Sequence, residues 1–343
     1  MRADLLSTRD HDFQSQSKYN DMTAALRAQL RWATMGIEMN PLDHLKDLIR
    51  PFIFRYNTYR MNRYLNGVLE SRYNSLLAKE NKPDLGKSII DLALKAYLKE
   101  NPSAETIPAP FKEAALSQIK LFIFAGHDTT SSAAVFAFHL LSKHADVLEK
   151  VREEHNAVLG PNAKDAPETL ISNPHLLNQL PYTLAAIKEA LRLYPTVSAI
   201  RAGTPDFSLV SPDGQSLPTD GFMVWGDHYS SHYHPEFWPQ PEKYLPERWL
   251  CKEGDALYPP ANAWRPFERG PRNCVGQELA LTEIKIILAL TVREFVVRNA
   301  YAEFDEKEGN KGGWEVAGSR AYMVRIGGGG HPADGYPCRV SML

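Results

Sequence analysis

Cysteine is scarce in this chain of 343 residues, which contains only three, at positions 251, 274 and 338. An odd number of widely spaced cysteines implies no disulfide framework. An excess of one charge is also lacking, because 39 Lys and Arg residues nearly balance 41 Asp and Glu residues. The resulting net charge of −2 gives no basis for a nucleic-acid partner.

Long apolar runs are lacking as well. No stretch of 18 or more apolar residues occurs, so nothing in the chain is expected to span a bilayer. The first residues, Met1 to Ser7, contain no apolar core of a signal peptide. A hydrophobic fraction of 43% and a charged fraction of 23% are ordinary for a globular protein, and length alone suggests two domains.

Helical patterns account for most of what is present. The longest runs from about Pro110 to His144 and is apolar on nearly all sides, which predicts a helix inside a core. An Asp213-Gly214 pair predicts a tight hairpin turn. Further helices are expected at residues 21–36, 52–79, 88–99, 145–159, 181–194 and 277–295.

Cys274 lies in the segment 266–276, Pro-Phe-Glu-Arg-Gly-Pro-Arg-Asn-Cys-Val-Gly. Gly270 and Gly276 allow the backbone to turn and to approach a ligand closely. Arg272 places a positive charge two residues before the cysteine, which lowers a thiol pKa and can hold a carboxylate. A helix that begins just after the loop adds favourable partial charge. These features predict a cysteine thiolate that ligates haem iron.

The long helix contains a polar interruption, Ala125-Gly126-His127-Asp128-Thr129-Thr130. A glycine in mid-helix costs about 1 kcal/mol relative to alanine, and threonines can bond to preceding carbonyls and bend a helix. Taken alone, the segment is equally compatible with a kink that has no chemical role.

A second polar pair lies in the helical pattern that Pro195 ends. Glu189 and Arg192 are three residues apart, so they share a helix face and can pair. Such a pair means little by itself. The segment Pro246-Glu-Arg248-Trp249, in a proline-rich irregular stretch, offers a second arginine.

Together these four segments resemble the cytochrome P-450 monooxygenases. The pattern Phe267-x-x-Gly270-x-Arg272-x-Cys274-x-Gly276 matches the haem-binding loop of that family. The other three segments precede it, and all four occur in the family's order. The resemblance covers nearly the whole chain. It implies a mainly α fold with small β-sheets and a single domain over residues 1–343. The long central helix would span about 110–144 and the cysteine haem loop 266–276.

The resemblance also implies roles for individual residues. Cys274 would be the axial ligand of haem iron, and Asp128 and Thr129 would relay protons to bound dioxygen. A buried structural ion network would position the cysteine loop, formed by Glu189, Arg192 and Arg248. Further haem contacts would come from Phe267, Gly270, Arg272, Gly276, Arg201, Ala125 and Gly126. The substrate would face Phe122, Val197, Ser198, Ala199 and Ile200.

The activity implied is that of a haem-thiolate monooxygenase, which inserts one oxygen atom of O2 into a lipophilic organic substrate. Its cofactor would be haem b, with electrons from NADPH supplied through a flavoprotein reductase. Arg265, Arg269 and Arg272 make the cysteine side basic, which suits an acidic partner; contact with haem and solvent explains Arg269 equally well. The tail from His331 onward is similar to fungal members used in secondary metabolism.

The start of the chain departs from the family. Eukaryotic members usually begin with a membrane-anchor helix, followed by a region whose Trp and Arg hold a haem propionate, and neither is recognised here. The chain is therefore expected to begin partway through the usual fold. The protein would be intracellular, and a full-length form would associate with the endoplasmic reticulum membrane only through that missing region.

Two alternatives stay open. A haem-free, inactive remnant would be expected to lose a residue such as Cys274 or Glu189, and both are present. A haem-thiolate isomerase or dehydratase would not need the Asp128-Thr129 pair. The histidines of His228-x-x-x-His232-x-His234 are expected to be structural rather than zinc ligands, and the glycine run 327–330 is expected to be a turn rather than a phosphate loop.

Overall fold

The computed structural model describes residues 21–32, 44–78, 88–309, 315, 319–324 and 330–343. The chain divides into two compact units, residues 1–127 and 128–343, and each is described by itself. The predicted glycine turn at 327–330 lies almost entirely outside the described residues. The assignment of the whole chain to one domain stays a prediction.

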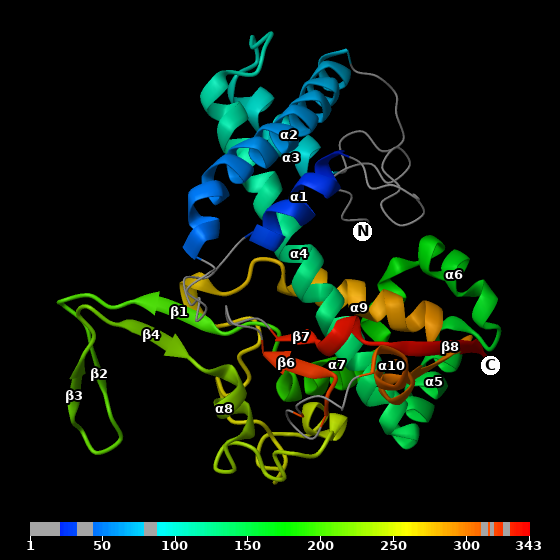
Figure 1. The fold of residues 1–343 in the computed structure, drawn as a ribbon. Helices are drawn as coiled ribbons and strands as arrows, with labels where there is room; N and C mark the ends of the chain where they lie inside the picture. Colours follow the sequence, from blue (N-terminus) through cyan, green and yellow to red (C-terminus); the bar gives the residue numbers. More distant parts are fainter. Residues whose placement is uncertain (1–20, 33–43, 79–87, 310–314, 316–318, 325–329) are drawn as a thin grey trace. The chain divides into compact units, whose positions relative to one another are not determined.

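The first unit is helical in the part that the structure describes (Figure 1). It contains α1 (Asp21–Trp32), α2 (His44–Leu77), α3 (Ile89–Glu100) and the first part of α4 (Ala109–Lys143). α3 begins with a capping box, in which the Asp91 amide donates to Ser88 Oγ at 3.1 Å and the Ser88 amide donates to the Asp91 carboxylate at 3.4 Å. The core of this unit includes Leu65 and Leu94, both fully buried.

The predicted start of α2 was wrong by eight residues. The expectation placed it at Phe52, where the helical pattern of the sequence was recognised. The helix instead runs through Pro51 from His44.

The second unit is built around α7 (Pro181–Leu193), which has buried residues along its whole length. α7 packs against α5 (Ala145–Leu159), α8 (His228–Tyr233) and α9 (Gln277–Thr291). It also packs against the irregular segment Pro246–Trp249. The core around it contains Phe136, Trp238, Ile284 and Leu288, none of which is exposed. The remaining helices are α6 (Ala166–Ser172) and α10 (Tyr301–Glu308).

All the described strands form two-stranded antiparallel pairs. The pairs are β1 (Ala199–Ala202) with β4 (Met223–Gly226), β2 (Ser208–Val210) with β3 (Ser216–Pro218), β5 (Phe295–Asn299) with β8 (Cys338–Met342), and β6 (Tyr322–Val324) with β7 (Gly330–Pro332). The fold is thus mainly α with small sheets, as the sequence predicts. The hairpin turn is also confirmed, with Gly214 at a φ of +84°.

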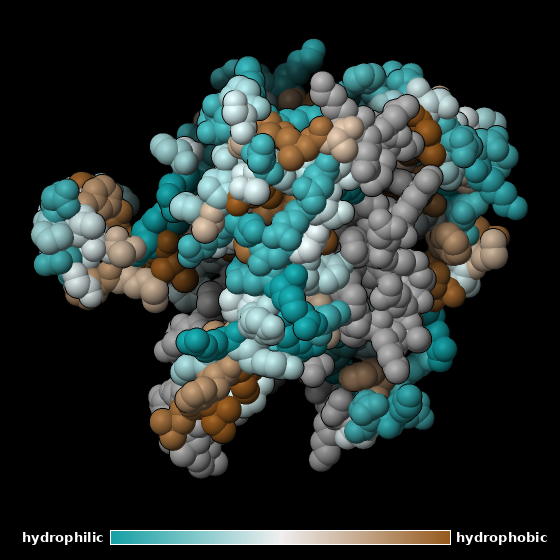
Figure 2. All heavy atoms as spheres, turned by 90° about the horizontal axis from the view of Figure 1, so that it is seen from above, coloured by the Kyte–Doolittle hydropathy of each residue, from teal (hydrophilic) through white to brown (hydrophobic). Residues whose placement is uncertain are grey.

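The β1–β4 and β2–β3 hairpins expose many apolar side chains. Val210 is 71% exposed and Phe222 68% exposed. Hydrophobic residues appear among hydrophilic ones on the part that projects at the left of Figure 2. The β2–β3 hairpin follows directly from the end of β1 (Figure 1).

α4 confirms the predicted long helix, but not its burial on all sides. Its last part, which includes Phe136 and Leu140, is buried. Its middle is not, since Leu121 is 56% and Phe124 43% exposed. An apolar helical pattern shows what a helix can bury, whereas the segments around it decide what it does bury. Among the described residues, no helix is both long enough and apolar enough to cross a membrane.

Candidate functional site

The cysteine loop is closed by its own backbone. The Cys274 amide donates to the Phe267 carbonyl at 2.8 Å, and the Asn273 amide donates to the Gly270 carbonyl at 3.0 Å. Gly270 has a φ of +78°, a left-handed conformation that favours glycine. α9 begins at Gln277, three residues after the cysteine, so the sequence-based expectation of a helix start beside the thiol is confirmed.

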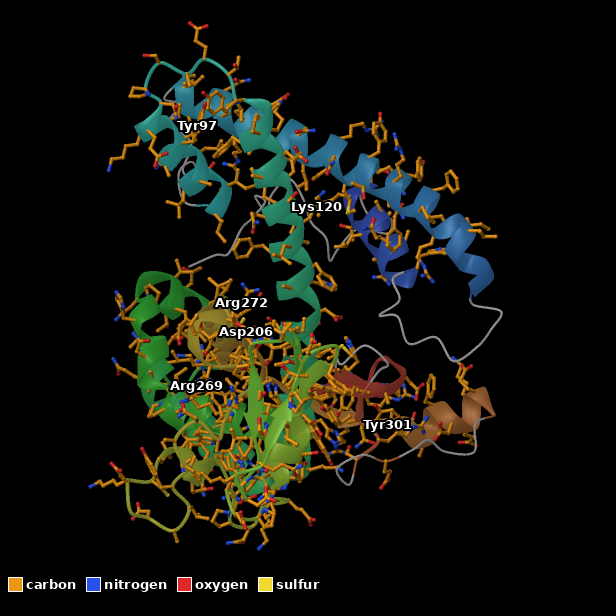
Figure 3. All side chains as sticks on the ribbon, turned by 90° about the vertical axis from the view of Figure 1, so that its left-hand side faces the viewer. Tyr97, Lys120, Asp206, Arg269, Arg272 and Tyr301 are labelled. Atoms are coloured by element: carbon orange, nitrogen blue, oxygen red, sulfur yellow. The ribbon has the colours of Figure 1, made fainter. Side chains whose placement is uncertain are left out.

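The loop presents an uncovered face. Residues 269–275 are all exposed, and Val275 is 87% exposed. Cys274 is a free, exposed thiol. Arg269 and Arg272, labelled in Figure 3, precede it by five and two residues and are exposed too. A cysteine and a valine side by side on a surface are unusual, because both residue types are normally buried.

This face fits a haem group. A single thiolate donor beside exposed apolar side chains suits a planar, apolar macrocycle, and the arginines suit its carboxylates. A Cβ atom added to Gly276 would lie 3.8 Å from Cys274 Sγ, an ordinary contact within the protein. The protein itself therefore leaves room beside the sulfur, and a glycine there keeps that room free for a ligand.

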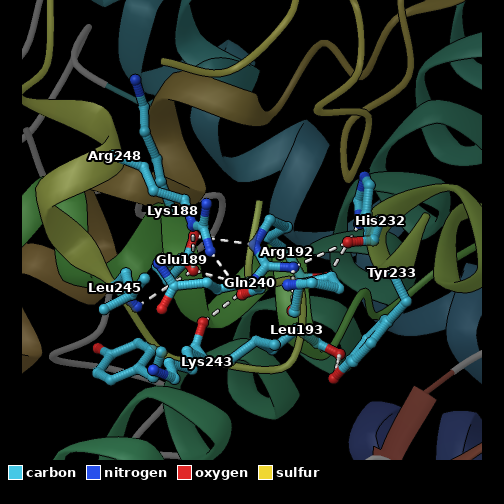
Figure 4. Close-up of polar contacts among 12 residues, drawn as sticks. Lys188, Glu189, Arg192, Leu193, His232, Tyr233, Gln240, Lys243, Leu245 and Arg248 are labelled. Atoms are coloured by element: carbon cyan, nitrogen blue, oxygen red, sulfur yellow. Dashed lines mark hydrogen bonds and ion pairs between the residues drawn. The ribbon is translucent and has the colours of Figure 1, made fainter. Parts of the chain in front are cut away.

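The predicted ion network exists, as the contacts in Figure 4 show, and its three side chains are completely buried. Arg192 uses all five of its N–H groups. Nε and Nη2 donate to the two carboxylate oxygens of Glu189 at 3.0 and 2.8 Å. Nη1 donates to the carbonyls of His232 and Pro241, and Nη2 donates also to that of Lys243. This one side chain fastens α7 to α8, through His232, and to two points of the segment that follows α8, through Pro241 and Lys243.

Glu189 is satisfied as fully as Arg192. Its carboxylate also accepts from Arg248 Nε at 3.1 Å, from the Leu245 amide at 3.2 Å and from Trp249 Nε1 at 3.1 Å. Arg248 donates through Nη2 to the Gln240 carbonyl at 2.7 Å, while its buried Nη1 has no partner in the described part of the chain. Two guanidinium groups share one carboxylate, and backbone carbonyls accept most of the remaining N–H groups.

His232 extends the network to the start of the cysteine loop. Its Nδ1 donates to the Arg192 carbonyl at 3.0 Å, and its Nε2 accepts from the Arg265 amide at 3.0 Å. This pattern requires the neutral ring with its proton on Nδ1. Burial, together with the nearby positive charge of His228, lowers the pKa of His232 to about 3. The histidine thus acts as a neutral bridge between α7 and the approach to the loop.

Asp128 and Thr129 both lie on α4 and are half-buried. The Nε2 atom of His331, on β7, is 3.4 Å from an Asp128 carboxylate oxygen, and its Nδ1 atom is 3.4 Å from Ser132 Oγ. Nothing in the sequence indicated this contact, because 203 residues separate His331 from Asp128. Ala125 and Gly126 lie one turn earlier on α4, at exposed positions, and Phe122 is half-buried.

The segment predicted to meet substrate and a haem propionate forms β1 and the residues before it. Val197 and Ile200 are 41% and 39% exposed, Ser198 and Ala199 are half-buried, and Arg201 is exposed. The Arg201 guanidinium donates to the Ile200 carbonyl at 2.9 Å. The proposed ligand contacts of these residues stay predictions.

One residue of the loop, Glu268, was missed by the sequence analysis, as was the contact that it makes with His228. Glu268, inside the loop, lies 2.7 Å from His228 on α8. The available signal was a carboxylate within a segment otherwise rich in arginine, but its partner is 40 residues away and only the fold reveals it.

The helix-rich fold and the exposed cysteine loop define a protein with one thiol ligand presented to a large cofactor. Comparison with known proteins identifies the family, since the cytochrome P450 family model matches residues 13–311. The chain therefore belongs to the cytochrome P450 family. The resemblance inferred from the four sequence segments is confirmed.

Individual relatives support this assignment. The cytochrome P450 monooxygenase polC of Polytolypa hystricis is 44% identical over 339 residues, which cover 97% of this chain and 60% of that protein. The cytochrome P450 monooxygenase acrF of Aspergillus aculeatus is 33% identical, with 96% of this chain and 68% of that protein covered. The crystal structure of the cytochrome P450DA haem domain matches with a TM-score of 0.70 at 23% identity, covering 96% of this chain and 62% of that chain. This chain thus spans 60% of the length of polC.

Proposed function

We propose that this chain is the haem-binding part of a haem-thiolate monooxygenase, which inserts one oxygen atom of O2 into a lipophilic organic substrate. The observation that carries the proposal is Cys274, a free thiol on an exposed loop closed by backbone hydrogen bonds, in a member of the cytochrome P450 family. The names of polC and acrF as monooxygenases support the same reaction class.

Cys274 would ligate the iron of haem b, and the exposed residues of the loop would contact the macrocycle. A thiolate ligand pushes electron density onto the iron and favours cleavage of the O–O bond of bound dioxygen. Phe267 packs in the core beneath the loop, with its ring 5.8 Å from that of Trp264. Arg272, Arg201 and Gly276 would complete the contacts on the loop and on β1.

Asp128 and Thr129 would carry protons toward the oxygen. Their neighbours Ala125 and Gly126 lie one turn earlier on α4, where the lack of a side chain at position 126 leaves space. Residues 197–200, with Phe122, would face a lipophilic substrate, since ligand pockets are lined mainly by apolar side chains.

Electrons would come from NADPH through a flavoprotein reductase. Arg265, Arg269 and Arg272 lie on one loop, and Arg265 is 40% exposed despite its ion pair with Glu268. Exposed arginines favour docking of an acidic partner and accelerate its approach. We extend the proposal to a role in fungal biosynthesis, which the fungal origins of polC and acrF support. We also propose that a full-length form would associate with a membrane only through a region that precedes the described fold.

The test is the reduced, carbon-monoxide difference spectrum of the 343-residue chain expressed with haem supplied. The red-shifted Soret band of thiolate ligation is expected for the wild-type chain and for Cys251→Ser and Cys338→Ser. Cys274→Ala should lose that band. A thiolate band that survives Cys274→Ala would overturn the ligand assignment.

Absence of haem uptake by the wild-type chain would instead support the haem-free alternative for this chain as it stands. An isomerase or dehydratase would show the thiolate band but would convert its substrate without NADPH and reductase. Thr129→Ala separates these two cases further, because only a monooxygenase would divert its electrons to hydrogen peroxide when proton delivery fails.

A further inference from the structure

Glu268 occupies a strained position in the cysteine loop. Its φ is +60°, a left-handed conformation that costs a residue with a Cβ atom about 1 kcal/mol or more. A glycine at this position would avoid the cost. The contacts of the Glu268 side chain must therefore contribute more stabilising free energy than this conformation costs.

Three contacts of the Glu268 carboxylate account for this. One oxygen lies 2.7 Å from His228 Nε2, and the other accepts from Arg265 Nη2 at 3.0 Å and from the Arg269 amide at 3.3 Å. Burial opposes the charged form, but the hydrogen bonds from His228 and Arg265 outweigh it and lower the pKa of Glu268 to about 2. The carboxylate is ionised and only 18% exposed.

His228 faces an acceptor on each side of its ring. Its Nδ1 donates to the Val197 carbonyl at 2.8 Å, while its Nε2 faces the Glu268 carboxylate. Both nitrogens can donate only when the ring carries two protons. The other groups facing it are the neutral His232, whose ring centroid lies 6.1 Å away, and Arg265, which shares Glu268. The geometry gives His228 an acceptor at each ring nitrogen, an arrangement that no aliphatic side chain of its size reproduces.

The contacts of His228 join two separate parts of the candidate site. Val197 lies two residues before β1, which carries Ile200 and Arg201. Glu268 lies between Phe267 and Gly270 in the loop that ends at Cys274. His228 is only 4% exposed and reaches both from the first turn of α8.

We propose that His228 and Glu268 form a positioning clamp that holds the cysteine loop and the β1 strand in one fixed arrangement. This inference rests on the proposed function only in that the two held segments are those expected to contact haem. Neither clamp residue touches Cys274 in the hydrogen-bond network, so both act through the backbone that they fasten.

Amide hydrogen exchange of the chain without haem tests the clamp directly. The reporters are the Cys274 amide, bonded to Phe267, and the amides of β1, paired with β4. Glu268→Ala should accelerate exchange in both places, by about tenfold, the loss expected for a hydrogen bond to a charged group. The effect on β1 is the diagnostic one, since Glu268 reaches Val197 only through His228. Glu268→Gln, which preserves the side-chain shape, should give the same pattern with a smaller amplitude.

The double variant sharpens the result. If the two residues form one clamp, His228→Ala with Glu268→Ala should accelerate β1 exchange no more than either single substitution. Glu154→Ala is a matched control, because Glu154 also accepts backbone amides, those of Tyr182 and Thr183 at the start of α7. It should change exchange around α7 and leave the ratio of loop to β1 exchange unaltered.

Independent, additive effects of the two substitutions would overturn the clamp, as would a response of the loop without a response of β1. A second measurement applies when haem is bound: Glu268→Gln should increase the fraction of carbon-monoxide complex that lacks the thiolate band. If the wild-type chain takes up no haem, the proposed function fails, while the exchange experiment still decides the clamp.

Discussion

The ion network around Glu189 and the loop around Cys274 are both recognisable in the sequence, yet they differ in how completely the protein satisfies them. Glu189, Arg192 and Arg248 have no exposed surface, and the carboxylate accepts five hydrogen bonds. Cys274 and its neighbours are exposed. Apart from Arg248 Nη1, the network finds its hydrogen-bond partners within the described residues, whereas the loop presents groups for something else to bind. The buried residues thus stabilise the fold around the site, whereas the exposed residues are available to bind a ligand.

Acid should have the largest effect, because it acts on three buried histidines, His139 on α4, His155 on α5 and His232 on α8 beside the network. Burial lowers the pKa of His139 and His155 to about 4 and that of His232 to about 3. The native state keeps all three neutral, while the unfolded chain binds a proton at each below about pH 6.5. Stability is therefore full above pH 6.5 and falls as the pH drops toward 4. At pH 5 each histidine should cost about 2 kcal/mol, measurable as a lower urea midpoint than at pH 7.

Glu189→Ala should be the most damaging single substitution. It leaves two buried guanidinium groups without their carboxylate, which costs about 3–5 kcal/mol of unfolding free energy. Denaturant unfolding measures the loss. Glu303→Ala removes the carboxylate of an exposed pair with Arg339 and should leave the midpoint unchanged. Equal effects of the two substitutions would contradict the contrast between buried and exposed pairs.

The two arginines of the network should not be equivalent. Arg192→Lys loses a two-point contact with Glu189 and bonds to three carbonyls, while Arg248 already leaves Nη1 unpaired among the described residues. Lysine cannot reproduce the planar fork of arginine. We expect Arg192→Lys to destabilise the protein by about 1–2 kcal/mol more than Arg248→Lys. The reverse order in thermal or urea unfolding would show that the shared carboxylate, not the carbonyls, dominates.

Cys274→Ser should have the smallest effect on stability, less than about 0.5 kcal/mol, because the side chain is exposed. The same substitution should remove the thiolate band completely. The carbon-monoxide spectrum therefore separates Cys274→Ser from Glu303→Ala, whereas unfolding of the haem-free chain shows almost no effect of either substitution. A large loss of stability in the haem-free Cys274→Ser chain would place the thiol in the scaffold instead.

Much of the fold was predictable because its signals are local. Asp213-Gly214 marked the hairpin and Pro195 the end of α7. The start of α2 was placed too late, since the helix continues through Pro51 to His44. The burial of α4 was mispredicted because an apolar pattern does not specify which segments cover it.

The site divides along the same line. The sequence by itself determined the family and the cysteine loop, because each depends on residue types at short spacings within motifs. Those motifs also supplied Glu189, Arg192 and Arg248, although Arg248 lies 59 residues from Glu189 and was joined to it only through the resemblance. Only the tertiary structure decided that His232 is a neutral bridge, that His331 lies beside Asp128, and that Glu268 meets His228. Those contacts join residues that are 33 to 203 positions apart, and a hydrogen bond over such a separation depends on the packing of the helices and strands that bring its two ends together.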